Sequence, residues 1–205
     1  PRPAVALVLL ALAGVVPLAP RGARSAKGDV PYAVVVTFTL GILAAFTASP
    51  SARLLLDYWG PLDVPTLRLL GQIVLVQAVP LGLGLLLRSR SHARAIEKVV
   101  GAVNVAVSVV IVAAALVLLP RTGAVRSLAA LLFAGLMAAL GYAFGGRDPA
   151  ARRSLAAVAN MPNVALALLV VAGAGLDRGF AVAVVGLFVI RLLAALVTQK
   201  VLARA

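Results

Sequence analysis

Residues 156–170, AAVANMPNVALALLV, place two asparagines and a proline inside a long apolar run. Pro162 has no backbone N–H to donate to a helix, and its ring clashes with the preceding turn. In hydrocarbon, a broken turn is tolerated only where it is buried in protein or lines a wet cavity. We therefore predict a broken membrane helix in which Asn160, Met161 and Asn163 form a binding site for a polar ligand or an ion.

The composition of the whole chain is that of a membrane protein. Of its 205 residues, 63% are hydrophobic and 12% are charged, whereas soluble domains are about half apolar and about a quarter charged. The apolar runs are continuous and reach the roughly 20 residues that a membrane-spanning helix needs, so we predict an all-α integral membrane protein. The six clear spans and one shorter span are expected at residues 30–49, 66–87, 99–119, 127–145, 154–175, 179–199 and 4–19.

The residue inventory excludes two other classes of protein. The net charge of +13 would suit a nucleic-acid-binding protein, but all Lys and Arg residues except Arg191 fall in the links between spans or near the ends of spans, which is typical of membrane proteins. There is no cysteine, the single histidine (His92) lies in a basic link, and no Asp or Glu falls inside a predicted span. The usual groups of an intramembrane enzyme are therefore absent, and we expect no catalytic residue, no metal centre and no nucleic-acid partner.

The distribution of basic residues predicts a topology. Twelve Lys and Arg residues fall in links on one side of the membrane and six on the other. The positive-inside rule then places the C-terminus in the cytoplasm and the start of the chain outside. The high content of Ala, Arg, Gly and Val suggests a GC-rich bacterial genome and therefore the cytoplasmic membrane. Because the first residue is Pro1, we also expect further sequence upstream.

A second interrupted segment lies at the start of the chain. Residues 4–29 combine an apolar helix with Gly14, Pro17 and Pro20 and, like residues 154–175, precede an uninterrupted span. Under the topology above, the two interrupted segments run in opposite directions, which is the best sequence indication of an inverted-repeat secondary transporter with two broken crossing helices. The prolines are also compatible with simple kinks.

Two stretches resemble the bile acid:sodium symporter family. Residues 20–46, PRGARSAKGDVPYAVVVTFTLGILAAF, are similar to its fourth-to-fifth helix region, where a polar break leads to a Gly-Asp pair, here Gly28 and Asp29. Residues 152–173, RRSLAAVANMPNVALALLVVAG, are similar to its ninth helix, whose broken centre carries an asparagine, here Asn163. The resemblance implies that the visible segments, about seven, are spans four to ten of a ten-span protein.

The resemblance also implies a core domain that moves against a panel domain. The core would comprise residues 1–49 and residues 127–205, which include the broken helix at 160–163. The panel would comprise the two spans within residues 66–119.

Individual residues of this core can be matched to those of the family. By motif match, Asn163 falls on a substrate-facing asparagine and Thr37 on a sodium-ligating threonine, with Thr39 as a second candidate ion ligand. The chain departs from sodium-coupled members at three positions, where it has Ala33, Val158 and Pro162 in place of a serine, a glutamate and a glutamine.

Arg191 lies inside the last predicted span. A charged residue deep in a membrane helix costs at least about 2.5 kcal/mol on insertion scales. Two interpretations are open. In the first, the side chain snorkels to the inner membrane surface or anchors a helix end. In the second, it faces the translocation path as the counter-charge of an anionic substrate.

These observations predict a secondary transporter that moves a small organic anion or amphipathic solute across the bilayer by alternating access. The substrate-binding candidates are Asn160, Met161, Asn163 and Arg191, and the ion-binding candidates are Thr37 and Thr39. We expect no cofactor other than a coupling ion, either Na+ or H+. The alternative is a non-transporting or truncated membrane paralogue. The sequence leaves the direction of transport and the oligomeric state open.

Overall fold

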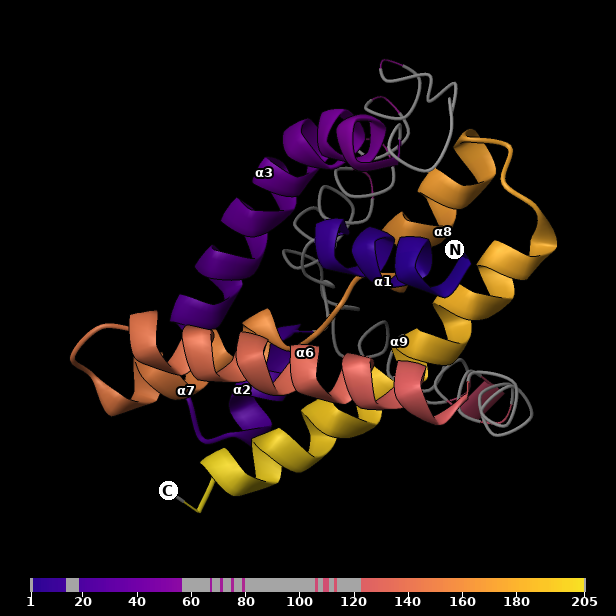
Figure 1. Ribbon diagram of the computed structural model, residues 1–205. Coiled ribbons are helices and arrows are strands. Elements are labelled where there is room, and N and C mark those ends of the chain that lie inside the picture. Colours follow the sequence, from indigo (N-terminus) through magenta and orange to yellow (C-terminus); the bar gives the residue numbers. More distant parts are fainter. Residues whose placement is uncertain are drawn as a thin grey trace.

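The computed structural model describes residues 2–13, 19–56 and 123–204, together with isolated positions between 67 and 113. The described residues are helical apart from short connections (Figure 1). The helices are α1 (Arg2–Leu12), α2 (Ala19–Ser25), α3 (Val30–Leu56), α6 (Ala124–Phe144), α7 (Pro149–Ala159), α8 (Val164–Gly173) and α9 (Arg178–Leu202). The predicted spans 66–87 and 99–119, and with them the panel domain, lie almost wholly outside the described residues.

Both predicted interruptions separate two helices. Around Pro162, α7 ends at Ala159 and α8 begins at Val164. Near the start of the chain, α1 and α2 are separate helices. The polar stretch between the predicted spans 4–19 and 30–49 is not wholly a link, because α2 continues to Ser25. This short helix turns small residues inward and basic residues outward, so its polar sequence is compatible with packing: Ala19, Gly22 and Ala23 are buried, and Arg21 and Arg24 are exposed.

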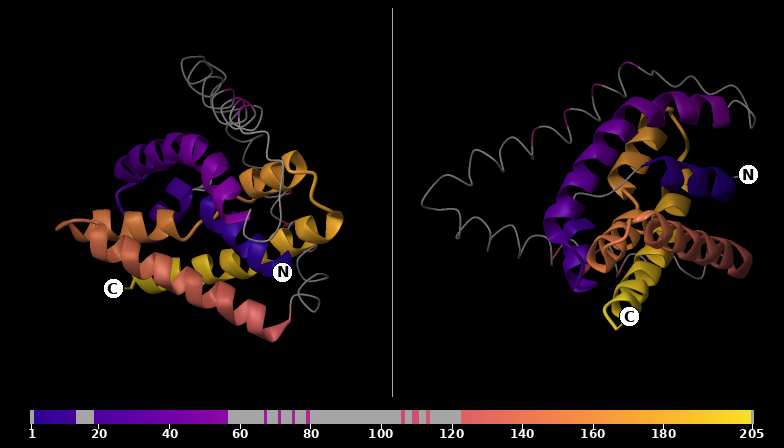
Figure 2. Two further views of the ribbon diagram at one scale, coloured as in Figure 1. Left: turned by 45° about the horizontal axis from the view of Figure 1, so that its top comes forward. Right: turned by 90° about the vertical axis from the view of Figure 1, so that its left-hand side faces the viewer.

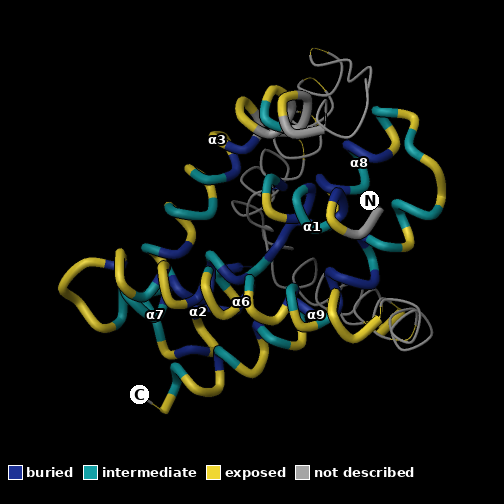
Figure 3. The backbone as a smooth tube through the Cα atoms, viewed as in Figure 1, coloured by how far each residue is buried: buried dark blue, intermediate teal, exposed yellow. Residues whose placement is uncertain are grey.

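The two broken helices pack with opposite halves together. Helix α2 contacts α7, and α1 contacts α8. The second half of each broken helix therefore lies beside the first half of the other, and the segment that joins α7 to α8 lies between these two pairs. The segment 160–163, which joins α7 to α8, is largely buried at this position (Figure 3).

Helices α9 and α6 hold the two pairs together. Helix α9 contacts both halves of both broken helices and packs its Val184, Leu187 and Ile190 into the same apolar core as Leu9 and Leu10 of α1. Helix α6 runs back along α7 and also packs against α9 (Figure 1). The buried positions of α6 are all small residues, Ala130, Ala134, Ala138 and Gly141. At Gly141 the backbone of α7 is so close that an added Cβ atom would lie 2.7 Å from the Leu155 carbonyl oxygen.

The outer faces of the helices are apolar. Val35, Phe38 and Phe46 of α3 and Leu128 and Leu132 of α6 are exposed. Soluble monomers rarely expose large contiguous apolar patches, so these faces suit contact with lipid. Among the described helices, α6 and α9 are long and apolar enough to cross a membrane. Helix α3 is longer still, contains Pro50 and curves along its length (Figure 2).

Each acidic residue in the described part of the chain caps the start of a helix. Asp29 Oδ1 accepts a hydrogen bond from the Tyr32 backbone N–H at 3.0 Å before α3. Asp148 caps α7, as its place before Pro149 predicts, and Asp177 caps α9. A carboxylate is favourable there, because it satisfies a free N–H group and the helix start carries partial positive charge.

Candidate functional site

Asn163 begins the second half of the broken helix. Its side chain is 6% exposed, and its Oδ1 accepts a hydrogen bond from the Leu166 backbone N–H at 3.1 Å. This is an N-cap, in which a side-chain oxygen satisfies one of the free N–H groups at a helix start. The amide oxygen of the predicted substrate-facing asparagine therefore also has a structural role.

Asn160, at the end of α7, reaches across to α9. It is 1% exposed, and its Nδ2 donates to Thr198 Oγ1 at 3.3 Å. The Thr198 hydroxyl in turn donates to the Ala194 carbonyl at 2.8 Å. Asn160 Oδ1 has no hydrogen-bond partner among the described residues. This buried acceptor is free to bind a donor group.

Met161 and Gln199 converge on Gly22 of α2. A Cβ atom built on Gly22 would lie 2.9 Å from Met161 Sδ and 2.7 Å from Gln199 Nε2. Gln199 is 4% exposed, and its Nε2 finds no partner in the part of the chain that is described. The second break is thus surrounded by polar atoms from α9 that the sequence interpretation missed. Their only sequence signal is the Thr198–Gln199 pair near the end of an apolar span.

The two threonines predicted as ion ligands are separated by the structure. Thr37 Oγ1 is buried and has no hydrogen-bond partner among the described residues, whereas Thr39 is exposed. A threonine in a membrane helix usually bonds to its own backbone, as Thr47 does with the Leu43 carbonyl at 2.8 Å. Thr37 makes no such bond among the described residues, and the exposed Thr39 does not join it in the interior.

Arg191 points into the protein. Its side chain is 2% exposed, and its Nη1 donates to the Leu10 carbonyl in the last turn of α1 at 3.3 Å. Its Cζ lies 4.7 Å from the centroid of the Phe133 ring of α6, within the range of cation–π attraction. The guanidinium is therefore held by α1 and α6 inside the fold, at the end of α1, and the side chain does not extend to the surface of the described structure.

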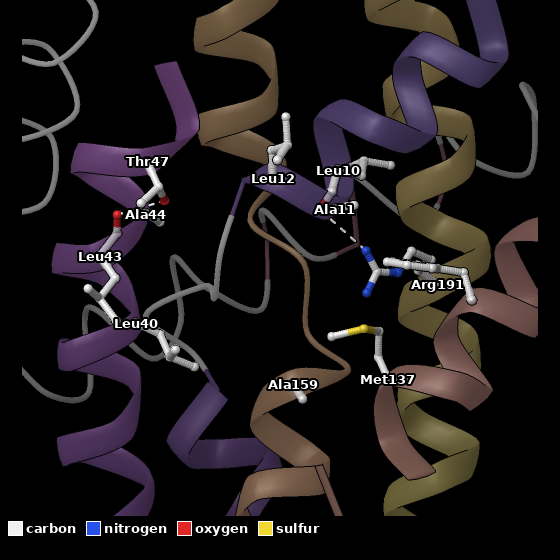
Figure 4. A pocket seen from close by; sticks show the side chains of 11 residues that line it. Leu10, Ala11, Leu12, Leu40, Leu43, Ala44, Thr47, Met137, Ala159 and Arg191 are labelled. Carbon is white, nitrogen blue, oxygen red and sulfur yellow. Dashed lines mark hydrogen bonds between the residues drawn. The ribbon is translucent and has the colours of Figure 1, made fainter. Parts of the chain in front are cut away.

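The Arg191 side chain lines a cavity of about 300 Å³. The cavity lies between α1, α3, α6 and α9 and extends to Ala159 at the end of α7 (Figure 4). Its walls are mostly apolar: they are formed by Leu10, Ala11, Leu12, Leu40, Leu43, Ala44, Thr47, Phe133, Met137, Ala159 and Arg191. Ligand pockets have this character, with an apolar lining and a few polar groups that fix orientation.

The cavity has two chemically different sides. The guanidinium lies on one side, next to α1, and the side chains of Leu40 and Leu43 lie across from it on α3 (Figure 4). A molecule with an anionic head and an apolar body would match both sides. Arg191 and Ala159, the last residue of α7 before the second break, therefore line the same cavity.

Comparisons with known proteins identify the family of the chain. The family model described as the sodium bile acid symporter family matches residues 1–122, which contain α1, α2 and α3. None of the curated proteins compared with the chain matches it. The matched region is more than half of the 205 residues, and it confirms the resemblance noted in the sequence. The chain therefore belongs to the sodium bile acid symporter family, a family of transporters embedded in the membrane.

Proposed function

We propose that this protein is a secondary transporter that carries a small organic anion across the cytoplasmic membrane by alternating access. Membership of the family supports the general class. The observation that carries the finer proposal is the packing of the two broken helices, with α2 against α7 and α1 against α8. In inverted-repeat transporters, the substrate site lies where two such interrupted helices meet.

The helices on both sides of the interruptions would move together. Helix α9 contacts all four halves of the broken helices, and Ser154 of α7 donates a hydrogen bond to the Asp29 carbonyl at 2.8 Å. These contacts support a core domain formed by residues 1–49 and 127–205, which rocks against the panel within residues 66–119. The cytoplasmic C-terminus and the bacterial origin predicted from the sequence belong to this proposal.

The solute would contact the second break and the cavity beside it. The Asn160 Oδ1 atom offers an acceptor that no described residue occupies, and Arg191 offers a cation. Met161 and Asn163 complete the site on the segment that joins α7 to α8.

Uptake into proteoliposomes tests the proposal. The full-length protein is reconstituted, and entry of labelled benzoate, octanoate and larger organic anions is followed with an inward sodium gradient, an inward proton gradient or neither. We expect at least one anion to enter faster than in protein-free liposomes. Folded protein that gives no uptake of any anion under the three conditions would overturn the proposal.

A further inference from the structure

The positive charge of Arg191 is incompletely balanced within the described part of the chain. A guanidinium has five N–H donors. One hydrogen bond, from Nη1 to the Leu10 carbonyl, is observed, and Nε has no partner there. The end of α1 supplies partial negative charge, equivalent to about half an elementary charge. The face of the Phe133 ring adds a weaker attraction.

No carboxylate among the described residues lines the cavity. The three described acidic residues, Asp29, Asp148 and Asp177, cap the starts of α3, α7 and α9 instead. A buried charge without a full partner is unfavourable. The cavity beside Arg191 is therefore suited to a ligand that brings one negative charge.

The same geometry disfavours a metal cation. Carbonyl groups at the end of a helix attract cations, but the Leu10 carbonyl at the end of α1 already accepts a hydrogen bond from Arg191. A metal cation entering the cavity would approach a fixed positive charge in a medium of low dielectric constant, where like charges repel strongly.

We propose that Arg191 is a tethered cation: a positive charge fixed to α9 that balances the charge of the ligand, as a coupling sodium ion would otherwise do. The cavity then binds one compact monoanion, a carboxylate or a sulfonate, without bound sodium. The part of this inference that concerns transport rests on the proposed function. The part that concerns binding stands on the cavity itself.

The volume of the cavity sets the size of the anion. About 300 Å³ is at the lower end of the range of ligand pockets, and about twice the 150 Å³ of an engineered cavity that holds benzene. An aromatic or medium-chain carboxylate fits this space. Its head group would lie on Arg191, and its apolar body would lie against Leu40 and Leu43 of α3.

Calorimetric titration of the purified full-length protein tests this assignment. Octanoate is titrated in sodium chloride and in choline chloride at the same ionic strength, and methyl octanoate serves as the uncharged ligand. We expect the same dissociation constant for octanoate in both salts, and binding of methyl octanoate at least about tenfold weaker. Octanoate binding that requires sodium would overturn the proposal.

Substitution of Arg191 measures how much its positive charge contributes to the affinity for octanoate. Arg191→Gln should weaken octanoate binding by about 30-fold or more, because the anion loses a buried charged partner, and Arg191→Lys should restore part of the affinity. Arg178→Gln is the matched control, since Arg178 is exposed at the start of the same helix. Equal octanoate affinity in wild type and folded Arg191→Gln would also overturn the proposal. If Arg191→Gln does not fold, the proposal is tested by the octanoate titrations of the wild-type protein in sodium chloride and in choline chloride.

Uptake and binding together distinguish this inference from the proposed function. If octanoate binds through Arg191 without sodium but does not enter liposomes, the binding assignment stands and the transport proposal fails. If anions are taken up only with sodium and Arg191→Gln leaves uptake unchanged, the transport proposal stands and the tethered-cation assignment fails.

Discussion

The two interrupted helices differ in which residues form hydrogen bonds with the free backbone groups at the interruption. At the second interruption, these hydrogen bonds come from neighbouring residues of the same segment: Asn163 caps α8, and the Asn160 and Met161 backbone N–H groups donate to carbonyls at the end of α7. At the first interruption, one carbonyl at the end of α1 accepts its hydrogen bond from Arg191, which is 181 residues away in the sequence. The sequence GVVPL that follows α1 contains no polar side chain.

The two interruptions therefore differ in the net charge that their hydrogen-bond donors bring. Both interruptions leave carbonyl groups at the end of a helix that need a donor. A local amide or backbone donor brings no net charge, whereas a donor from α9 brings a full positive charge into the interior. Arg191, which caps the end of α1, thereby also gives the neighbouring cavity its positive charge.

The largest expected effect comes from removing that charge. Arg191→Met should raise the free energy of unfolding of the ligand-free protein by about 1–4 kcal/mol, because apolar residues often replace buried ionic groups with a gain in stability. Unfolding in detergent micelles measures the change, with Arg178→Met as the exposed control on α9. A loss of stability would show that the Leu10 and Phe133 contacts outweigh the burial of the charge.

The second prediction concerns the contact between the two broken helices. A Cβ atom on Gly28 would overlap Ser154 Oγ and lie 2.9 Å from the Ser154 backbone nitrogen. Gly28→Ala should therefore reduce the free energy of unfolding by about 1–3 kcal/mol, the usual effect of overpacking. Gly22→Ala is the matched comparison, because its new Cβ atom would meet chiefly the flexible ends of Met161 and Gln199. The predicted contrast is contradicted if both alanines have equal effects on unfolding.

The third prediction separates the structural role of Asn163 from its proposed contact with the solute. Asn163→Ala should reduce the free energy of unfolding by about 1 kcal/mol through loss of the N-cap. Asn163→Ser retains a capping oxygen and should unfold close to wild type. Uptake by the serine variant then reports on the amide alone: reduced uptake supports solute contact, and unchanged uptake shows that the cap is its only role.

The smallest expected change in stability is that of Asn160→Ala. Its hydrogen bond to Thr198 is long, at 3.3 Å, and its Oδ1 is unpaired within the described structure. The loss should be about 0.5 kcal/mol, the lower end for a hydrogen bond, as measured by unfolding in detergent. A much larger loss would show that Asn160 holds α7 to α9, while reduced uptake at unchanged stability would support its role as a solute ligand.

Local sequence predicts much of this fold. Pro162 between two asparagines located the interruption between α7 and α8, and Asp148 before Pro149 is a local signal for the start of α7. These features act through the backbone within a few residues, so they can be read from the sequence alone. The same approach missed α2, because its basic residues suggested a link and only packing shows that its small residues face inward.

The site was less predictable because it depends on distant contacts. Nothing near Arg191 in the sequence indicates that it meets Leu10 and Phe133 rather than the membrane surface. Thr37 and Thr39 look equivalent in the sequence, yet one hydroxyl is buried and the other side chain is exposed. The polar contributions of Thr198 and Gln199 likewise appear only when α9 is packed against the end of α7 and against α2.

The connection between α2 and α3, residues 26–29, forms a corner that affects how the protein assembles in the membrane. The Asp29 backbone N–H donates to the Ala150 carbonyl at 3.3 Å, and the Asp29 carbonyl accepts a hydrogen bond from Ser154, which follows it by 125 residues. During synthesis, the early helices leave the ribosome long before α7 exists. The corner therefore enters the bilayer without these partners and is completed only when α7 arrives, which makes the docking of α7 a late step in biogenesis.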